Sequence, residues 1–217
     1  MRGDEYIHYG ATFWKKTFWQ GTEPQTHVRY DKAYWIATHA FPNYKADLTG
    51  DPKKIAENLE IVTKDDIGMN GITKAFMGDT GDAPGIGILP EWTAMYIVNQ
   101  GRDTKYTMLK QADLQGSWSM HAREYNTDMP ISFTKWPCAT WSPNAADSKN
   151  SLTGLTEKLP TISVPSHLPT NGNRADVSHH PDFCFVPYLI TGELFYLECL
   201  LTHFTYTILD MLSLIHI

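Results

Sequence analysis

Apolar residues in this chain recur mostly at the spacing of α-helices, in segments separated by glycine, proline and other turn residues. A broad apolar stripe predicts a helix over residues 26–41. The next helix is predicted over 52–63, where apolar residues recur at i, i+4 and i+7 behind a capping Asp51 and a first-turn Pro52. Four further helices are predicted over residues 90–98, 104–119, 181–190 and 194–209.

Between these helices the composition changes to that of turns and loops. Residues 6–19 alternate only loosely and predict a short extended segment. The stretch 68–87 holds six glycines and predicts a long loop, a feature that is often functional inside a domain. Residues 126–173 are rich in Pro, Ser, Thr and Asn, which predicts an irregular excursion whose aromatic residues pack against the domain.

The predicted helices form three similar pairs. Each pair has an apolar, aromatic helix, a Gly-containing turn and a second, amphipathic helix, at irregular spacing along the chain. Helical hairpins with long inserted loops are typical of an α/α toroid, where loops at one end build a cleft. The expected fold is therefore mainly α, a partial α/α toroid with long inserted loops and a short extended N-terminal segment. Its open side is expected to expose helix faces.

Composition narrows the classes of function. The 217 residues are 42% hydrophobic, which fits a folded chain, and the net charge of −6 argues against a nucleic-acid binder that relies on overall charge. In the apolar region from Phe183 onward, the longest uncharged native run, 199–209, is too short to span a bilayer, so no membrane span is expected. Cys138, Cys184 and Cys199 lack zinc-site spacing, and no metal or other cofactor is predicted.

The last six residues, 212–217, read LSLIHI, which back-translates to CTG TCT CTT ATA CAC ATC. This resembles a transposon-end adapter from shotgun libraries, so we expect a translated adapter; the alternative is a natural apolar helix. On the first interpretation, residues 1–211 are one truncated toroid domain, and the rest of the same larger polypeptide is its partner. The sequence does not determine the compartment, although an extracellular, cell-surface or virion location is slightly favoured.

Two segments carry a resemblance to other proteins. Residues 176–181, DVSHHP, and 186–198, VPYLITGELFYLE, resemble large uncharacterised bacterial and phage-associated proteins. Shorter matching motifs are FWQG at 18–21, PEW at 90–92 and DLQGSW at 113–118. The similarity runs from about Tyr6 to Leu197. It implies a β-rich region followed by a six-hairpin α/α toroid, a fold shared with glycosidases and polysaccharide lyases. It carries over no catalytic residues.

The first candidate site is the pair His179 and His180, which lies between Asp176 and Asp182 just before a predicted helix. A histidine there is suited to act as a general base or to bind a sugar hydroxyl at the rim of a cleft. The alternative is that one histidine caps the helix or packs under the loop. A metal held by both histidines is disfavoured, because adjacent histidines rarely reach one ion.

The second candidate site is the polar segment that follows the 104–119 helix. Polysaccharide lyases need a cation to neutralise a uronate carboxylate and a base to remove the adjacent proton. Arg123 supplies the cation, His121 and Tyr125 are candidate bases, and Asp128 adds a carboxylate. The alternative is a solvated helix end, with His and Arg near the C-terminal dipole.

Loop residues complete the candidate set. Asp79, Asp82 and Asp176 are candidate substrate-binding carboxylates, because glycosidases use two carboxyl groups on either side of the scissile bond, and Asp79 or Asp82 could pair with Asp176. The Asp-Thr-Gly motif at 79–81 lacks the context of an aspartic protease. Trp136 and Trp141 are candidate sugar platforms. Turn formation by the aspartates and loop anchoring by the tryptophans are the alternatives.

These observations predict a carbohydrate-active module that acts on a poly- or oligosaccharide by general acid/base chemistry, as a polysaccharide lyase or a glycoside hydrolase. The alternative is a non-catalytic bacterial surface or virion component that binds glycans or other subunits. Convergence of the histidines, Arg123 and a carboxylate in one place favours the enzyme. Dispersed polar residues favour the binding protein.

Overall fold

A computed structural model of the chain gives its fold. The structure describes residues 8–9, 15–18, 20–21, 27–45, 47–73, 85, 87–118, 120–123, 127, 129–130, 132, 134 and 180–215. This part of the chain is mainly α-helical, as the sequence predicts. Its helices are α1 (Lys32–Ala37), α2 (Pro52–Lys64), α3 (Glu91–Asn99), α4 (Arg102–Asp113), the 3₁₀ helix η1 (Leu114–Ser117), α5 (Phe185–Thr191) and α6 (Leu194–Ile215).

Two short strands add a small antiparallel ladder. They are β1 (His8–Tyr9) and β2 (Ala122–Arg123), paired so that His8 lies opposite Arg123. The ladder ties the start of the chain to the segment that follows η1. Of the predicted extended segment over residues 6–19, residues 8–9 form a strand, whereas the described residues 15–18 do not.

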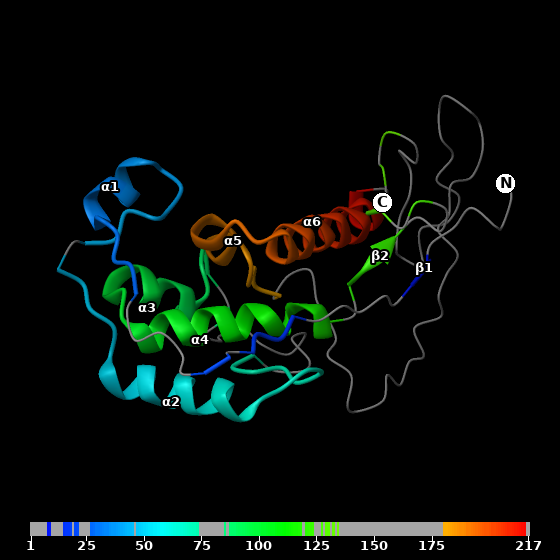
Figure 1. Cartoon of the computed structure of the whole chain (residues 1–217). Coiled ribbons are helices and arrows are strands. Elements are labelled where there is room, and N and C mark those ends of the chain that lie inside the picture. The colour runs from blue at the N-terminus through cyan, green and yellow to red at the C-terminus, as the bar shows by residue number, and fades with distance from the viewer. Residues whose placement is uncertain are drawn as a thin grey trace, which may run out of the picture.

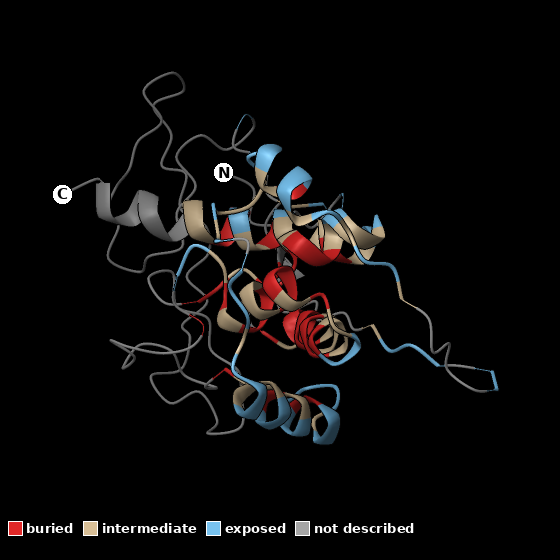
Figure 2. Cartoon of the chain, turned by 90° about the vertical axis from the view of Figure 1, so that its left-hand side faces the viewer, coloured by how far each residue is buried: buried red, intermediate tan, exposed pale blue. Residues whose placement is uncertain are grey.

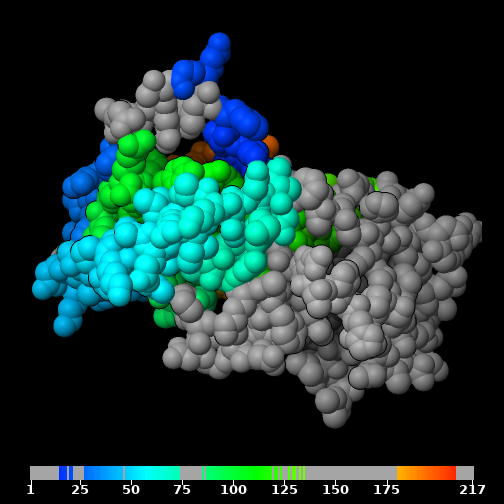
Figure 3. Space-filling model, turned by 90° about the horizontal axis from the view of Figure 1, so that it is seen from below, coloured from blue at the N-terminus to red at the C-terminus, as the bar shows by residue number. Residues whose placement is uncertain are grey.

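The helices lie in three layers, with α3 and α4 in the middle (Figure 1). Helix α2 packs below them, mainly against α4, while α1, α5 and α6 lie above. Figure 2 shows that α2, at the bottom of the view, exposes most of its outer face while the middle layer is buried. The face seen in Figure 3 is formed in its described part largely by α2 and the chain that follows it.

Helix α2 begins as the sequence predicts. The Asp51 carboxylate accepts a hydrogen bond from the Lys53 N–H at 3.0 Å, and Pro52 occupies the first turn, where its missing N–H costs nothing. The apolar positions of the helix face the middle layer, and Val62 is 1% exposed. Helices α3 and α4 likewise form a packed pair, although α4 begins at Arg102 rather than at the predicted residue 104.

The predicted helix over 26–41 is largely wrong, because α1 covers only six residues. The buried side-chain amide of Gln100 bonds both the N–H and the C=O of Tyr30, so the backbone there is held outside the helix. Asp31 then caps α1 by accepting from the Tyr34 N–H at 3.0 Å. Helices α1 and α2 lie on opposite sides of the middle layer, so the first predicted pair is not a packed hairpin.

Helices α5 and α6 form the packed pair that the sequence predicts, with Gly192 in the left-handed conformation between them. Helix α5 starts at Phe185 rather than at residue 181, because the carboxylate of Asp182 accepts from the N–H groups of Cys184 and Phe185. Helix α6 continues to Ile215. Among the described helices, none combines the length and the apolar character needed to cross a membrane.

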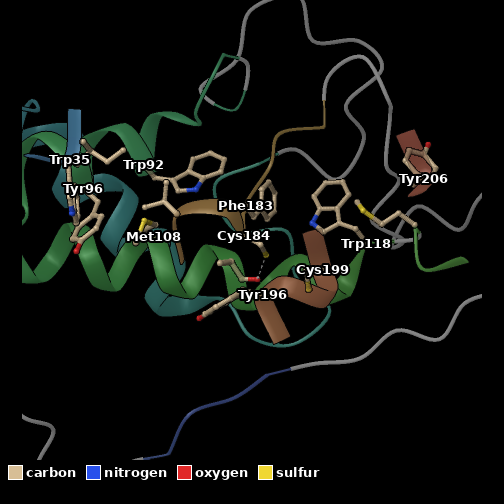
Figure 4. Packing of buried hydrophobic residues seen from close by; sticks show 14 residues of the cluster. Trp35, Trp92, Tyr96, Met108, Trp118, Phe183, Cys184, Tyr196, Cys199 and Tyr206 are labelled. Carbon is tan, nitrogen blue, oxygen red and sulfur yellow. Dashed lines mark hydrogen bonds between the residues drawn. The ribbon is translucent and has the colours of Figure 1, made fainter. Parts of the chain in front are cut away.

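The core runs through the middle layer and the underside of α5 and α6 (Figure 4). Aromatic rings dominate it: Trp92 meets Phe183 edge-on at 5.5 Å between ring centroids, and Trp35 stacks on Phe41 at 5.0 Å. Tyr196 and Cys199 bring α6 into the same cluster. Most of the glycine-rich loop and of the 126–173 excursion lies outside the described residues.

Candidate functional site

Three histidines that are distant in sequence lie close together in the structure. We name them the histidine cluster: His121, His180 and His203. His121 immediately precedes β2, His180 precedes α5, and His203 lies on α6. His121 and His180 are almost completely buried, with 1% and 6% of their surface exposed. Two of the predicted site histidines are therefore neighbours, and α6 adds a third.

His180 is the centre of the cluster. Its ring lies 5.0 Å from the ring of His203, and it packs edge-on against Trp118 at 4.5 Å between centroids. Its Nε2 is 3.4 Å from the side-chain oxygen of Gln115. Its Nδ1 is buried without a hydrogen-bond partner among the described residues. A buried polar atom of this kind is costly to desolvate, so its position marks a place where a polar group is expected to bind.

Arg123 stands beside the cluster and links it to the surface. Its guanidinium forms an ion pair with the carboxylate of Glu198, on α6. The Arg123 side chain is 8% exposed, whereas that of Glu198 is 42% exposed. A solvent-accessible carboxylate is thus held by a buried cation, whose charge also acts on His121.

Burial keeps the histidines neutral. Desolvation lowers the pKa of His121 to about 4, and the nearby Arg123 charge lowers it further, against an opposing hydrogen bond with the Gln115 backbone. Desolvation also lowers the pKa of His203 to about 4. The pKa of His180 lies well below its usual value, because of burial and then because of its neighbours His203 and His121. All three rings are therefore uncharged at neutral pH.

Chemically, the arrangement offers neutral imidazoles, one guanidinium and one accessible carboxylate. A neutral imidazole can accept a proton, although a pKa near 4 makes it a weak base. The guanidinium is suited to bind a substrate carboxylate in competition with Glu198. The Glu198 side chain is 42% exposed and open to contact from solvent, whereas His121 and His180 are buried.

The other predicted site residues lie outside the described part of the chain. These are the candidate catalytic residues Tyr125, Asp128 and His179 and the candidate substrate-binding residues Asp79, Asp82, Trp136, Trp141 and Asp176. The structure thus brings together His121, Arg123 and His180. It leaves the roles of the remaining candidates as predictions.

The sequence analysis missed four side chains that the structure adds to this place: Gln115, Trp118, Glu198 and His203. A usable signal existed on α6, which carries polar residues at 198, 202 and 205, at i, i+4 and i+7. In an otherwise apolar helix this spacing marks an edge that faces polar groups. No local pattern identifies Gln115 or Trp118, because their partners are distant in sequence.

A second polar network joins the N-terminal segment to α4 and α6. The Lys15 ammonium donates to the Tyr196 hydroxyl at 2.8 Å, and this hydroxyl donates to the Asp113 carboxylate at 2.8 Å. Lys15 also contacts Glu193 at 2.8 Å. Burial raises the pKa of Asp113, an effect that Lys15 and Tyr196 oppose. The adjoining cavity, lined also by Asp65, holds about 20 Å³, room for one water.

Neither metal ligation nor family membership assigns a function. Within the described ranges no three His, Cys, Asp or Glu side chains are placed to hold a metal ion. No protein-family model, curated protein or solved structure matches the chain. The functional conclusion therefore depends on the geometry of the site.

Proposed function

We propose that this chain is a carbohydrate-active module, of the polysaccharide lyase or glycoside hydrolase type, built on part of an α/α toroid. The observation that carries the proposal is the convergence of His121, Arg123 and His180 with Glu198. These residue types supply a cation for an acidic sugar, a carboxylate and imidazoles. The helical pairs α3–α4 and α5–α6 support the toroid, because packed helical hairpins are its building unit.

In this proposal an acidic polysaccharide binds over Glu198. Its uronate carboxylate displaces Glu198 from Arg123, and the guanidinium then neutralises the sugar carboxylate. Neutralisation makes the adjacent C–H proton easier to remove, and the released Glu198 carboxylate accepts this proton. The electron pair of the C–H bond forms a C=C bond as the glycosidic C–O bond breaks, and the leaving oxygen takes a proton from water. His180 and Gln115 act as positioning residues, because they contact each other at 3.4 Å within the buried cluster that includes His121, the histidine whose pKa the Arg123 charge lowers.

The test is a screen of the purified chain against uronate-containing and neutral polysaccharides. New reducing ends report any cleavage, and the ultraviolet absorbance of unsaturated uronates reports lyase cleavage alone. We expect cleavage of an acidic polymer, a loss of at least about 100-fold in Arg123→Gln, and retention in the control Lys53→Gln on exposed α2. Glu198→Gln tests the carboxylate as a proton acceptor separately from the Arg123 cation, because it removes the negative charge of residue 198 and leaves Arg123 in place.

Absence of both products from every polymer, with a chain that is folded by circular dichroism, would overturn the enzymatic proposal. A second candidate function, non-catalytic binding of glycans or other subunits, is favoured by a separate observation. Large apolar side chains of α5 and α6 are exposed, including Leu189, Leu194 and Phe204. Binding of the same polysaccharides without cleavage, measured by calorimetry, would support this second function.

A further inference from the structure

Two cysteines lie close together in the core, where α5 and α6 pack against each other. Cys184 is the residue before α5, and Cys199 lies in the second turn of α6. Both are free thiols, and both are buried, Cys184 with 1% of its surface exposed and Cys199 with 0%. The Cys184 thiol makes a hydrogen-bond contact with the Cys199 thiol. Figure 4 shows both side chains in the same part of the core.

Both cysteines are held in place by contacts with the last turn of α4. The Sγ atom of Cys184 lies 3.8 Å from the carbonyl oxygen of Ala112. On α6, one turn before Cys199, the Tyr196 hydroxyl donates to the neighbouring Asp113 at 2.8 Å. The side-chain cap that starts α5 also fixes the backbone N–H of Cys184. The start of α5 and the first turns of α6 are thus anchored side by side, which keeps the two thiols in contact.

A disulfide forms where two sulfur atoms can approach to about 2 Å, and thiols that already touch need the least rearrangement. In the folded chain, however, this pair is shielded from oxidants. Burial, and then the contact with Cys199, raises the pKa of the Cys184 thiol well above its ordinary value, so little reactive thiolate is present. The stage at which the two cysteines are both reactive and accessible is folding, before α6 closes over Cys184.

We propose that Cys184 and Cys199 form an intrachain disulfide when the chain folds in an oxidising compartment, and that this bond joins the start of α5 to α6. The oxidant is a small-molecule disulfide of the glutathione type. One cysteine thiolate attacks it, displaces one glutathione thiolate and forms a mixed disulfide. The second cysteine thiolate attacks the protein sulfur of that mixed disulfide and releases the other glutathione. The two cysteines lose two electrons and two protons, and the oxidant gains them as two thiols. The proposal does not depend on the proposed function.

Refolding of the full chain from urea in a buffer of oxidised and reduced glutathione tests the proposal. After the remaining thiols are alkylated, peptide mapping by mass spectrometry should show Cys184 joined to Cys199 and Cys138 alkylated. The matched control Cys138→Ser should form the same bond. We expect the oxidised chain to melt about 5–10 °C above the reduced chain, because the bond lowers the entropy of the unfolded state. Cys199→Ala should abolish this difference.

A second measurement needs neither refolding nor a variant. The parent chain exported to a bacterial periplasm and alkylated at harvest should contain the same bond, whereas the chain made in the reducing cytoplasm should not. Three alkylated cysteines, in a chain from the periplasm that is folded by circular dichroism, would overturn the proposal. A disulfide from Cys138 to either of the other two would also overturn it, because Cys184 and Cys199 would then not be partners.

Discussion

Single buried side chains hold the loops of this protein to its helices. Gln100 bonds the backbone of Tyr30, and Gln111 bonds both the Ile72 N–H and the Asn70 C=O. Each amide offers both a donor and an acceptor, so one side chain satisfies two backbone groups that would otherwise be buried unpaired. Gln115 instead contacts two side chains, with its oxygen 3.4 Å from His180 Nε2 and its nitrogen directed at the sulfur of Met120. These contacts set the position of the candidate site.

The histidine cluster makes stability depend on pH. The folded pKa of His121 is about 4, below the ordinary value of 6.5, so folding favours the neutral ring. Its stabilising contribution is therefore complete above pH 6.5 and is lost as the pH falls from 6.5 toward 4. The Arg123 charge also lowers the pKa of His121, and His203, whose pKa is lowered to about 4, adds to the loss in the same direction.

We expect His121 alone to lower the free energy of unfolding by about 2 kcal/mol between pH 7.5 and 5. Urea unfolding at the two values measures this, and His121→Gln should show a correspondingly smaller loss. The control His39→Asn, at an exposed left-handed position, should match the parent. Asp113 and Asp182 act in the opposite direction, because burial raises their pKa values. Equal losses in parent and His121→Gln would contradict the prediction.

At the scale of elements, local signals decide where helices begin, and their capping residues differ in how deeply they are buried. Asp51 caps α2 at the surface through one hydrogen bond. Asp182 caps α5 through two, at 2.9 and 3.1 Å, in a site that raises the pKa of its carboxyl by burial. Because Asp182 lies only two residues after His180, this cap also helps to position the histidine cluster.

Removal of the α5 cap should therefore destabilise the fold more than removal of the α2 cap. We expect Asp182→Ala to cost about 2 kcal/mol and Asp51→Ala about 1 kcal/mol, measured as the free energy of unfolding in urea. Asp182→Asn keeps an acceptor oxygen and should lie between Asp182→Ala and the parent. A cost of Asp182→Ala no greater than that of Asp51→Ala would show that the second hydrogen bond contributes nothing.

On the scale of the whole molecule, polar networks join segments that are far apart in sequence. Lys15 reaches Tyr196 on α6, and Tyr196 reaches Asp113 on α4, so three parts of the chain meet at one buried hydroxyl. The Asp113 side chain is only 11% exposed, so its partners are not readily replaced by water. Such a network should contribute more to the free energy of unfolding than ion pairs on the surface do.

A double-mutant cycle of Lys15→Met and Tyr196→Phe measures this contribution. We expect a coupling free energy of about 1–2 kcal/mol, because the Lys15–Tyr196 hydrogen bond involves a charged donor in a partly buried site. The control cycle, Lys53→Met with Glu57→Gln on exposed α2, should give at most about 0.5 kcal/mol. Equal coupling in the two cycles would show that burial adds nothing here.

The sequence by itself determined the mainly α-helical class, the start of α2 and the pair α5–α6, because these follow from short-range spacing and capping. It predicted His121, Arg123 and His180 as site residues without establishing that they meet. Only the tertiary structure decided that α1 is short, that α1 and α2 are separated, and that Glu198 and His203 join the cluster. Those outcomes depend on buried hydrogen bonds between distant segments, which no local periodicity encodes.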